Sequence, residues 1–221
     1  MLVKICGVRT PEIAIAAASA GADFIGFVFF PKSPRFIAPE VAQEIVTAVK
    51  RAADELGFAI PAMVGLFVDP GERSLAEAAP FVSHVQLHGH EDAERIAEIR
   101  AAFGLSVIKA VGVADKADLA PVGPLAEAAD MLLFDARPPK GAERPGGHGE
   151  RFDAPLLLRY RFETPFLLAG GLDPSNVADA ARSLRDAPAF AGVDVSTGVE
   201  SRPGEKDPAM VKAFMASAKC A

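Results

Sequence analysis

Eight short apolar segments recur along the chain between longer alanine-rich segments, and this alternation limits the possible folds more than any other feature. The apolar segments contain many β-branched and aromatic residues, as buried strands do. The longer segments carry apolar residues at helical spacing. Since each strand is followed by a helix that returns the chain, the strands are expected to be parallel. We predict strands at residues 2–6, 24–30, 62–68, 84–87, 106–111, 130–135, 166–169 and 192–196.

The longer segments begin and end as helices do. Thr10 precedes Pro11 and Asp207 precedes Pro208, so each of these helices starts with a capping side chain and a proline in its first turn. Lysine and arginine at positions 50 and 51 suit the negative end of a helix dipole. We predict helices at residues 11–20, 39–51, 91–102, 116–129, 153–160, 174–184 and 208–219, with a weaker one at 71–79.

Eight strand–helix repeats leave two ways to close the sheet. It can form a closed barrel or an open, doubly wound sheet with helices on both faces. The repeats are even, and none has the features of an edge strand, which favours the barrel. No proline-rich or polar linker divides the 221 residues, and 50% of them are hydrophobic, which is enough for one large core. We therefore predict an α/β protein whose residues 1–221 form a single (β/α)8 TIM barrel.

Charge and cysteine content argue against several classes of protein. The formal net charge of −6 gives no basic footprint for nucleic acid. The apolar run at 24–31 is far shorter than the roughly 20 residues that span a bilayer. Cys6 and Cys220 lie near opposite ends of the chain, so neither a disulfide framework nor a zinc cluster is expected, and a reducing cytoplasm is the natural location. No long exposed apolar patch is evident, so a monomer is favoured over a homodimer.

The reactive side chains of the sequence gather where the predicted strands end. In parallel barrels this rim carries the active site. Cys6 ends the first strand and Asp135 the sixth, and Arg35 follows the second. Cys6 is either a core residue or a nucleophile or general base. Asp135 either caps a turn or is an acid whose apolar neighbours raise its pKa. Arg35 is either an ordinary surface residue or a two-pronged partner for a carboxylate.

Two glycine-containing segments predict a phosphate site. Gly170 and Gly171 follow the seventh strand and precede a predicted helix, whose first amides and positive dipole end favour an anion. Ser196, Thr197 and Gly198 follow the eighth strand and add further donors. Phosphate sites in barrels often use the loops after these two strands.

Histidines near the fourth strand could suggest a metal, but their pattern does not fit one. His84, His88, His90 and Asp92 lie close together without a His-Glu-x-x-His helix or another ligand cluster. We predict no metal site. Gln86 and His88 end the strand, so we expect His88 to form hydrogen bonds at the rim.

Lys4 is unusual because alternation places it on the same face of the first strand as Cys6. A lysine inside the barrel needs a partner. Asp194 lies on the eighth strand, which is next to the first in a closed barrel. We predict a Lys4–Asp194 pair beneath the active site, with a separation of no more than about 6 Å, the outer reach of a strong charge effect.

A long connection follows Asp135. Residues 137–151 contain three prolines and four glycines without helical or strand periodicity. Such connections in compact domains are lids or solvated excursions. Its position after the strand that ends in Asp135 favours a lid.

A series of short motifs follows in order along nearly the whole chain: KICG at 4–7, FFPKSPR at 29–35, GLFV at 65–68, VQLHG at 85–89, LFD at 133–135, GG at 146–147 before FD at 152–153, LAGGL at 168–172 and VDVSTGVE at 193–200. Together these motifs resemble phosphoribosylanthranilate isomerases. The chain departs from the family pattern at residues 147–149, where His148 stands in place of a threonine or serine, and at Ala154, where an aromatic residue is common. Both departures put contacts of the lid in doubt.

The resemblance implies a cofactor-free enzyme of tryptophan biosynthesis that acts on N-(5-phosphoribosyl)anthranilate. It implies that Asp135 is the general acid on the ribose ring oxygen and that Cys6 is the general base at ribose C2. Arg35 would hold the anthranilate carboxylate. The phosphate would lie at Gly170, Gly171, Ser196, Thr197 and Gly198, with Gln86, His88 and Asp194 as further substrate-site residues.

Two other functions remain open from the sequence. A barrel isomerase of histidine biosynthesis, or a dual-specificity barrel, would perform the same rearrangement. It would resemble a chain with aspartates in both catalytic roles and with two phosphate sites. A non-catalytic protein that binds a phosphorylated ligand would keep the glycine loops, but it would not need Cys6 and Asp135.

Overall fold

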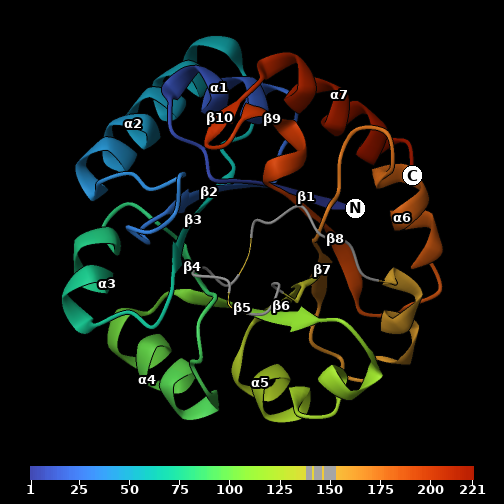
Figure 1. Ribbon diagram of the computed structural model, residues 1–221. Helices are drawn as coiled ribbons and strands as arrows, with labels where there is room; N and C mark the ends of the chain where they lie inside the picture. Colours follow the sequence, from blue (N-terminus) through green and yellow to red (C-terminus); the bar gives the residue numbers. More distant parts are fainter. Residues whose placement is uncertain (138–140, 142–145, 147–152) are drawn as a thin grey trace.

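Eight parallel strands form a closed barrel, which confirms the predicted (β/α)8 fold. The computed structural model describes residues 1–137, 141, 146 and 153–221. The helices form a ring around the barrel, and the chain follows the ring in sequence order (Figure 1). The strands are β1 (Leu2–Cys6), β2 (Phe24–Val28), β3 (Ala62–Phe67), β4 (His84–Leu87), β5 (Ser106–Val113), β6 (Met131–Ala136), β7 (Phe166–Leu168) and β8 (Phe190–Val195).

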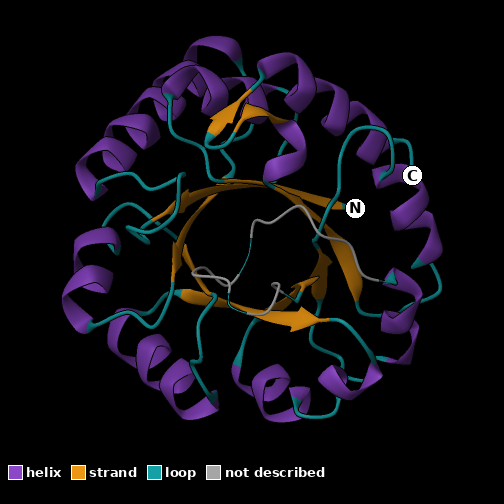
Figure 2. Cartoon of the chain, in the orientation of Figure 1, coloured by secondary structure: helices purple, strands orange, loops and turns teal. Residues whose placement is uncertain are grey.

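The helices lie on the outside of the sheet, so the barrel wall is covered by one helical layer (Figure 2). Helix α2 runs beyond its predicted end at residue 51 to Gly57, which has a φ of 75° and ends it in a left-handed conformation. The α-helices are α1 (Pro11–Ser19), α2 (Pro39–Leu56), α3 (Glu72–Ala78), α4 (Ala93–Phe103), α5 (Val122–Ala128), α6 (Val177–Ser183) and α7 (Pro208–Lys219).

Three of the predicted helices were wrong in detail. The helix predicted at 116–129 is a 3₁₀ turn, η1 (Lys116–Leu119), followed by α5, because Pro121 between them cannot donate a backbone hydrogen bond. The one predicted at 153–160 is also 3₁₀, η2 (Ala154–Arg159). The one predicted from Pro174 begins three residues later at Val177.

A short hairpin near the C-terminus was not predicted at all. Strand β9 (Glu200–Arg202) pairs antiparallel with β10 (Glu205–Lys206) after a 3₁₀ turn, η3 (Thr197–Val199). Only this turn separates the hairpin from β8, so the side chains of Glu200 and Lys206 lie against Arg35 and Ser196 at the mouth of the barrel.

The apolar core has two parts. The larger part lies between the strands and the helices, and it contains the outward-facing residues of the barrel wall, such as Val3 and Ile5. The smaller part fills the barrel interior with residues such as Phe24, Val64 and Ile108. Alternation along each strand separates the two sets. In β1 this alternation turns Lys4 into the interior, where it is completely buried.

No helix in the described part of the chain is long and apolar enough to cross a membrane.

Candidate active site

A cavity of about 740 Å³, including open space at its mouth, lies at the end of the barrel where the strands terminate. Every site residue that the sequence predicted contributes to its lining. These residues are Cys6, Arg35, Gln86, His88, Asp135, Gly170, Gly171, Asp194, Ser196, Thr197 and Gly198. The cavity brings together six strands that are distant in sequence, because parallel strands all end at this edge.

Cys6 is the last residue of β1 and is only 3% exposed. Gly7 follows with a φ of 76°, which lets the chain turn sharply toward Gly26, whose carbonyl accepts hydrogen bonds from the amides of Gly7 and Val8 at 2.9 Å each. A side chain at Gly7 would also collide with Arg35. Burial raises the pKa of the Cys6 thiol, and the nearby Lys4 opposes that rise.

The predicted pair between Lys4 and Asp194 is confirmed. The two residues are register partners of β1 and β8, and Nζ of Lys4 donates to Oδ1 of Asp194 at 2.8 Å. Burial by itself would lower the pKa of Lys4, but Asp194 and Cys6 together outweigh burial and the pKa is raised. Lys4 therefore stays positively charged at the floor of the cavity.

Asp135 lies at the end of β6, and its side chain is 15% exposed. Burial raises its pKa to about 7, with the negative charge of Asp194 acting in the same direction. The amide of Ala136 donates to Oδ1 at 2.8 Å, which opposes the rise and fixes the carboxyl group. A carboxyl group with this pKa still holds a proton near neutral pH and can act as a general acid.

His88 faces the same carboxyl group. Its Nε2 is 3.8 Å from Oδ2 of Asp135, and its Nδ1 is 3.5 Å from Nε2 of Gln86. Burial lowers the pKa of His88 to about 3, and the charges of Lys109 and Lys4 add to the effect. His88 is therefore a neutral imidazole that faces Asp135 from beyond hydrogen-bond distance.

Gly146, from the predicted lid, lines the cavity as well. A Cβ at this position would lie 2.8 Å from Oδ2 of Asp135 and from the His88 ring, so only glycine fits against the pair. The rest of the predicted lid, including Gly147, His148 and Gly149, lies outside the described residues apart from positions 137 and 141.

The two predicted phosphate segments meet at one side of the cavity. Gly170 and Gly171 have φ values of 85° and 61°, which favour glycine. A Cβ at Gly198 would overlap the carbonyl of Leu172, so the loop after β8 packs directly onto the loop after β7. Because α6 begins only at Val177, the helix dipole is further from these glycines than the sequence suggested. The donors near the cavity are therefore the loop amides and hydroxyls.

Arg35 differs from its predicted arrangement. Its Nε donates to Oε1 of Glu200 at 2.7 Å, and its Nη2 donates to Oε2 of Glu200 at 2.8 Å and to Oγ1 of Thr197 at 3.0 Å. The two-pronged pairing that we expected with a ligand carboxylate is thus made with Glu200. The guanidinium group still lines the cavity, so its role toward a ligand stays a prediction.

The sequence reasoning missed a buried charge cluster behind Arg35. Lys206 donates to the carbonyl of Ser196 and to Oε1 of Glu200, both at 3.1 Å, and its side chain is 1% exposed. Burial lowers the pKa of Lys206. Burial alone would raise the pKa of Glu200, but its hydrogen bonds with Arg35 lower it. Glu200 lies within the motif at 193–200, whereas Lys206 carries no periodic signal in the sequence.

A further buried ion pair supports the loop of His88. Lys109 on β5 donates to Oε2 of Glu91 at 2.7 Å and to the carbonyl of Gly89 at 2.8 Å. Glu91 also accepts from the amides of Gly89 and Asp69. This network fixes the loops after β3 and β4 against each other.

Two polar atoms in the cavity lack a hydrogen-bond partner within the described part of the chain. They are Oε1 of Gln86 and Oγ of Ser196, and both are buried. Buried polar groups are normally paired, so both atoms fit a site that a polar ligand completes. Over residues 1–137, 141, 146 and 153–221, the structure shows no group of three or more side chains suited to a metal ion.

Comparison with known proteins agrees with this geometry. The family model described as N-(5'phosphoribosyl)anthranilate (PRA) isomerase matches residues 3–217. The chain belongs to the phosphoribosylanthranilate isomerase family. An N-(5'-phosphoribosyl)anthranilate isomerase of Paracoccus denitrificans is 49% identical over 218 residues, which cover 98% of this chain and 96% of the relative. One from Cereibacter sphaeroides is 48% identical and covers 98% of both chains.

Solved structures of the family share the whole barrel. Phosphoribosyl anthranilate isomerase from Thermotoga maritima superposes with a TM-score of 0.84 at 38% identity, covering all of both chains. A second isomerase structure, in complex with reduced 1-(o-carboxyphenylamino)-1-deoxyribulose 5-phosphate, gives a TM-score of 0.80 at 35% identity, again over all of both chains.

Proposed function

We propose that this protein converts N-(5-phosphoribosyl)anthranilate into 1-(2-carboxyphenylamino)-1-deoxyribulose 5-phosphate in tryptophan biosynthesis. The observation that carries the proposal is the single cavity in which Cys6 and Asp135 lie with both glycine loops, in a chain of the isomerase family. A relative's structure contains the reduced form of this product, which supports the choice of ligand. The predicted cytoplasmic location and monomeric state stay predictions.

The first step needs an acid at the sugar ring. Asp135 gives its carboxyl proton to the ribose ring oxygen as the bond from that oxygen to C1 breaks. The lone pair of the anthranilate nitrogen then forms a double bond to C1, which gives an iminium ion. A carboxyl pKa of about 7 suits this step, because a useful fraction of Asp135 is protonated near neutral pH.

The second step needs a base at C2. The Cys6 thiolate takes the proton from C2, the pair of that C–H bond becomes the C1=C2 double bond, and the C=N pair returns to nitrogen. The resulting enolamine becomes the aminoketose when C1 gains a proton and the C2 hydroxyl loses one. The substrate's own nitrogen accepts and returns the electrons, so the rearrangement requires no metal or redox cofactor.

The rest of the cavity fixes the sugar between the two groups. We assign the phosphate to the loop amides at Gly171 and Gly198 and to the unpaired Oγ of Ser196. Oε1 of Gln86 is suited to accept a hydrogen bond from a ribose hydroxyl. We assign the anthranilate carboxylate to the side of the Arg35 guanidinium group that does not contact Glu200. Fixing both ends of the substrate places the reacting atoms near their partners and lowers the entropic cost of reaction.

The histidine-pathway alternative is less well supported. It would place an aspartate where Cys6 stands, and the described part of the cavity has one pair of glycine loops suited to phosphate, on the β7 and β8 side. The related structure with the reduced tryptophan-pathway ligand also favours the proposal. A non-catalytic binding protein would have no need for a carboxyl group held at a raised pKa beside a buried thiol.

A turnover assay tests the proposal. N-(5-phosphoribosyl)anthranilate is generated in situ, purified protein is added, and the loss of substrate fluorescence is followed, with the histidine-pathway aminoaldose tested in parallel. We expect multiple turnovers with the first substrate and none with the second. A folded protein that turns over only the second substrate, or neither, would refute the proposed function.

A further inference from the structure

Lys4 is a charged group inside the barrel that the proposed mechanism has not yet used. Its ammonium group is completely buried and is held by Oδ1 of Asp194 at 2.8 Å. Strand alternation turns it to the same face of β1 as Cys6, two residues later, so the ammonium and the thiol occupy successive levels of the same interior. Burying a charged lysine costs free energy even when the lysine is paired, and packing alone does not require a charge at this position.

Gly26 explains how the two groups come close to each other. It is the register partner of Cys6 on β2, and it has no side chain to fill the space between the strands. A Cβ built there would lie 2.9 Å from Sγ of Cys6 and 3.2 Å from Nζ of Lys4. Both atoms therefore border the same small gap. The distance between Sγ and Nζ is no greater than the total of these two distances.

Several charges face Cys6 from the elements around it. Lys4 on β1 and Lys206 on β10 favour its thiolate, whereas Asp194 on β8 disfavours it. Asp135 on β6 lines the same cavity and is largely protonated below about pH 7. Lys206 is already paired with Glu200. Lys4 is thus the main positive charge acting on the sulfur, and it acts against the effect of burial.

We propose that Lys4 is a positioning residue for the reaction, whose ammonium group, held by Asp194 and facing Cys6 across the gap at Gly26, stabilises the thiolate that acts as the base. The inference rests on the proposed function. Lys4 transfers no proton in the step: Sγ uses its lone pair to take the C2 proton, and the ammonium group keeps its three protons. Its contribution is electrostatic, since a fixed positive charge lowers the energy of a nearby anion in a dry site.

Removal of the Lys4 charge has a defined effect on the thiol. Lys4→Met removes the stabilising charge and leaves Asp194 facing the sulfur, so the thiol should become harder to ionise. Asp194→Asn is not the opposite test, because Asp194 is also the partner that keeps the buried Lys4 charged. An opposite charge within about 4–6 Å typically changes a pKa by one unit or more, and we expect the thiol pKa to rise by about that amount in Lys4→Met.

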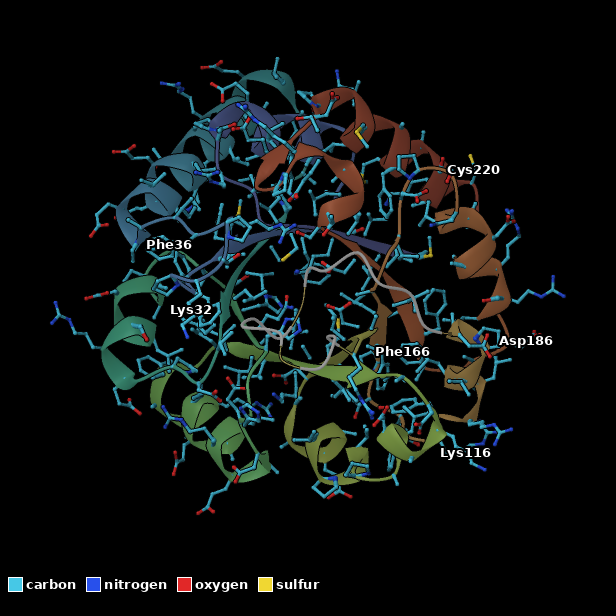
Figure 3. The ribbon with its side chains drawn as sticks, in the orientation of Figure 1. Lys32, Phe36, Lys116, Phe166, Asp186 and Cys220 are labelled. Carbon is cyan, nitrogen blue, oxygen red and sulfur yellow. The ribbon has the colours of Figure 1, made fainter. Side chains whose placement is uncertain are left out.

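The thiol can be titrated without any turnover. Cys220, the other free cysteine, is exposed on the outer ring of helices at the end of α7 (Figure 3), so Cys220→Ser provides a background with a single thiol. The rate of alkylation of Cys6 by iodoacetamide is measured against pH by mass spectrometry. Lys4→Arg, which keeps the charge, should restore most of the ionisation lost in Lys4→Met.

Gly26→Ala provides a test that leaves every charge in place. Its Cβ would enter the gap and push the sulfur and the ammonium group apart, so the thiol pKa should rise. Lys4→Met leaves the buried Asp194 unpaired, which can prevent folding. In that case Gly26→Ala still tests the inference. A thiol pKa unchanged in Gly26→Ala and in the folded Lys4 variants would overturn the inference.

Turnover separates this inference from the proposed function. If both hold, Lys4→Met lowers kcat with little change in KM. The alkaline limb of its kcat/KM profile, which the thiol sets because its pKa lies above that of Asp135, moves to higher pH with the thiol titration. A shifted titration with an unshifted activity profile would show that Lys4 acts on the thiol but that Cys6 is not the base, which would overturn the inference and leave the isomerase reaction intact. An unshifted titration in an active enzyme would contradict the role of Lys4 and leave the function intact.

Discussion

Replacement of Asp135 by asparagine should make the protein more stable at alkaline pH even as it removes the proposed acid. The carboxyl group is buried, and its pKa rises from 3.8 to about 7 in the folded chain. Above that pH the folded protein must hold a buried negative charge that the unfolded chain would expose to water. An asparagine of nearly the same shape carries no such charge at any pH.

The sign and size follow from proton linkage. Because the folded pKa is raised, the stability associated with Asp135 is fully present below pH 3.8 and is lost as the pH rises through about 7. The pKa rises by about three units, and each unit corresponds to roughly 1.4 kcal/mol in the free energy of unfolding, which gives about 4 kcal/mol. The stability of Asp135→Asn relative to wild type should therefore increase by up to about 4 kcal/mol between about pH 4 and about pH 8.

Urea denaturation of both proteins across this pH range measures the difference. Asp186→Asn is a matched control, because the side chain of Asp186 is 83% exposed and lies on the periphery (Figure 3), so its replacement should give no pH-dependent difference. The comparison within one pH cancels the titration of all other groups. A difference between Asp135→Asn and wild type that stays flat from acid to alkaline pH would refute the argument that burial holds the Asp135 proton.

Three further predictions follow from the same contacts. Activity should rise with pH up to about 7 and then level off, because above that pH the loss of protonated Asp135 offsets the gain of Cys6 thiolate; a kcat profile that keeps rising well above pH 7 would contradict the assignment of Asp135. Gly198→Ala should lower stability by about 1–3 kcal/mol, since its Cβ would overlap the Leu172 carbonyl, and a melting temperature equal to wild type would show that the loops can separate freely. Lys109→Met should destabilise the fold by about 3–5 kcal/mol in urea denaturation, because it leaves the buried charge of Glu91 without its cationic partner. Double replacement with Glu91→Gln should recover part of the loss, and equal losses in the single and double variants would argue against this pair.

Much of the fold could be predicted because its signals are local. Each strand is a short apolar run, and each such run begins within two residues of the observed strand. The Lys4–Asp194 pair was also predictable, since alternation gives the face of each residue and barrel closure makes β1 and β8 neighbours. Closure turns a local pattern into a contact between residues 190 positions apart.

The remaining features depend on contacts that no local pattern encodes. Arg35 was assigned to a ligand carboxylate, but its two-pronged hydrogen bonds are made with Glu200, 165 residues away in the sequence. Lys206 is buried on a two-residue strand that is too short to show a period. The late start of α6 reflects a turn in which Asn176 accepts from the amide of Asp173, so Asp173 does not cap a helix at Pro174.

The most direct test of the central claim is the single-turnover rate of Cys6→Ala and Asp135→Asn beside wild type, with N-(5-phosphoribosyl)anthranilate as substrate. General acid–base catalysis contributes about 10²–10⁴-fold to a rate, so each variant should be slower by at least about 100-fold. Both variants should still bind the reduced product analogue, because the phosphate loops are untouched. A Cys6→Ala or Asp135→Asn variant that reacts within about tenfold of the wild-type rate would contradict the assignment of that residue.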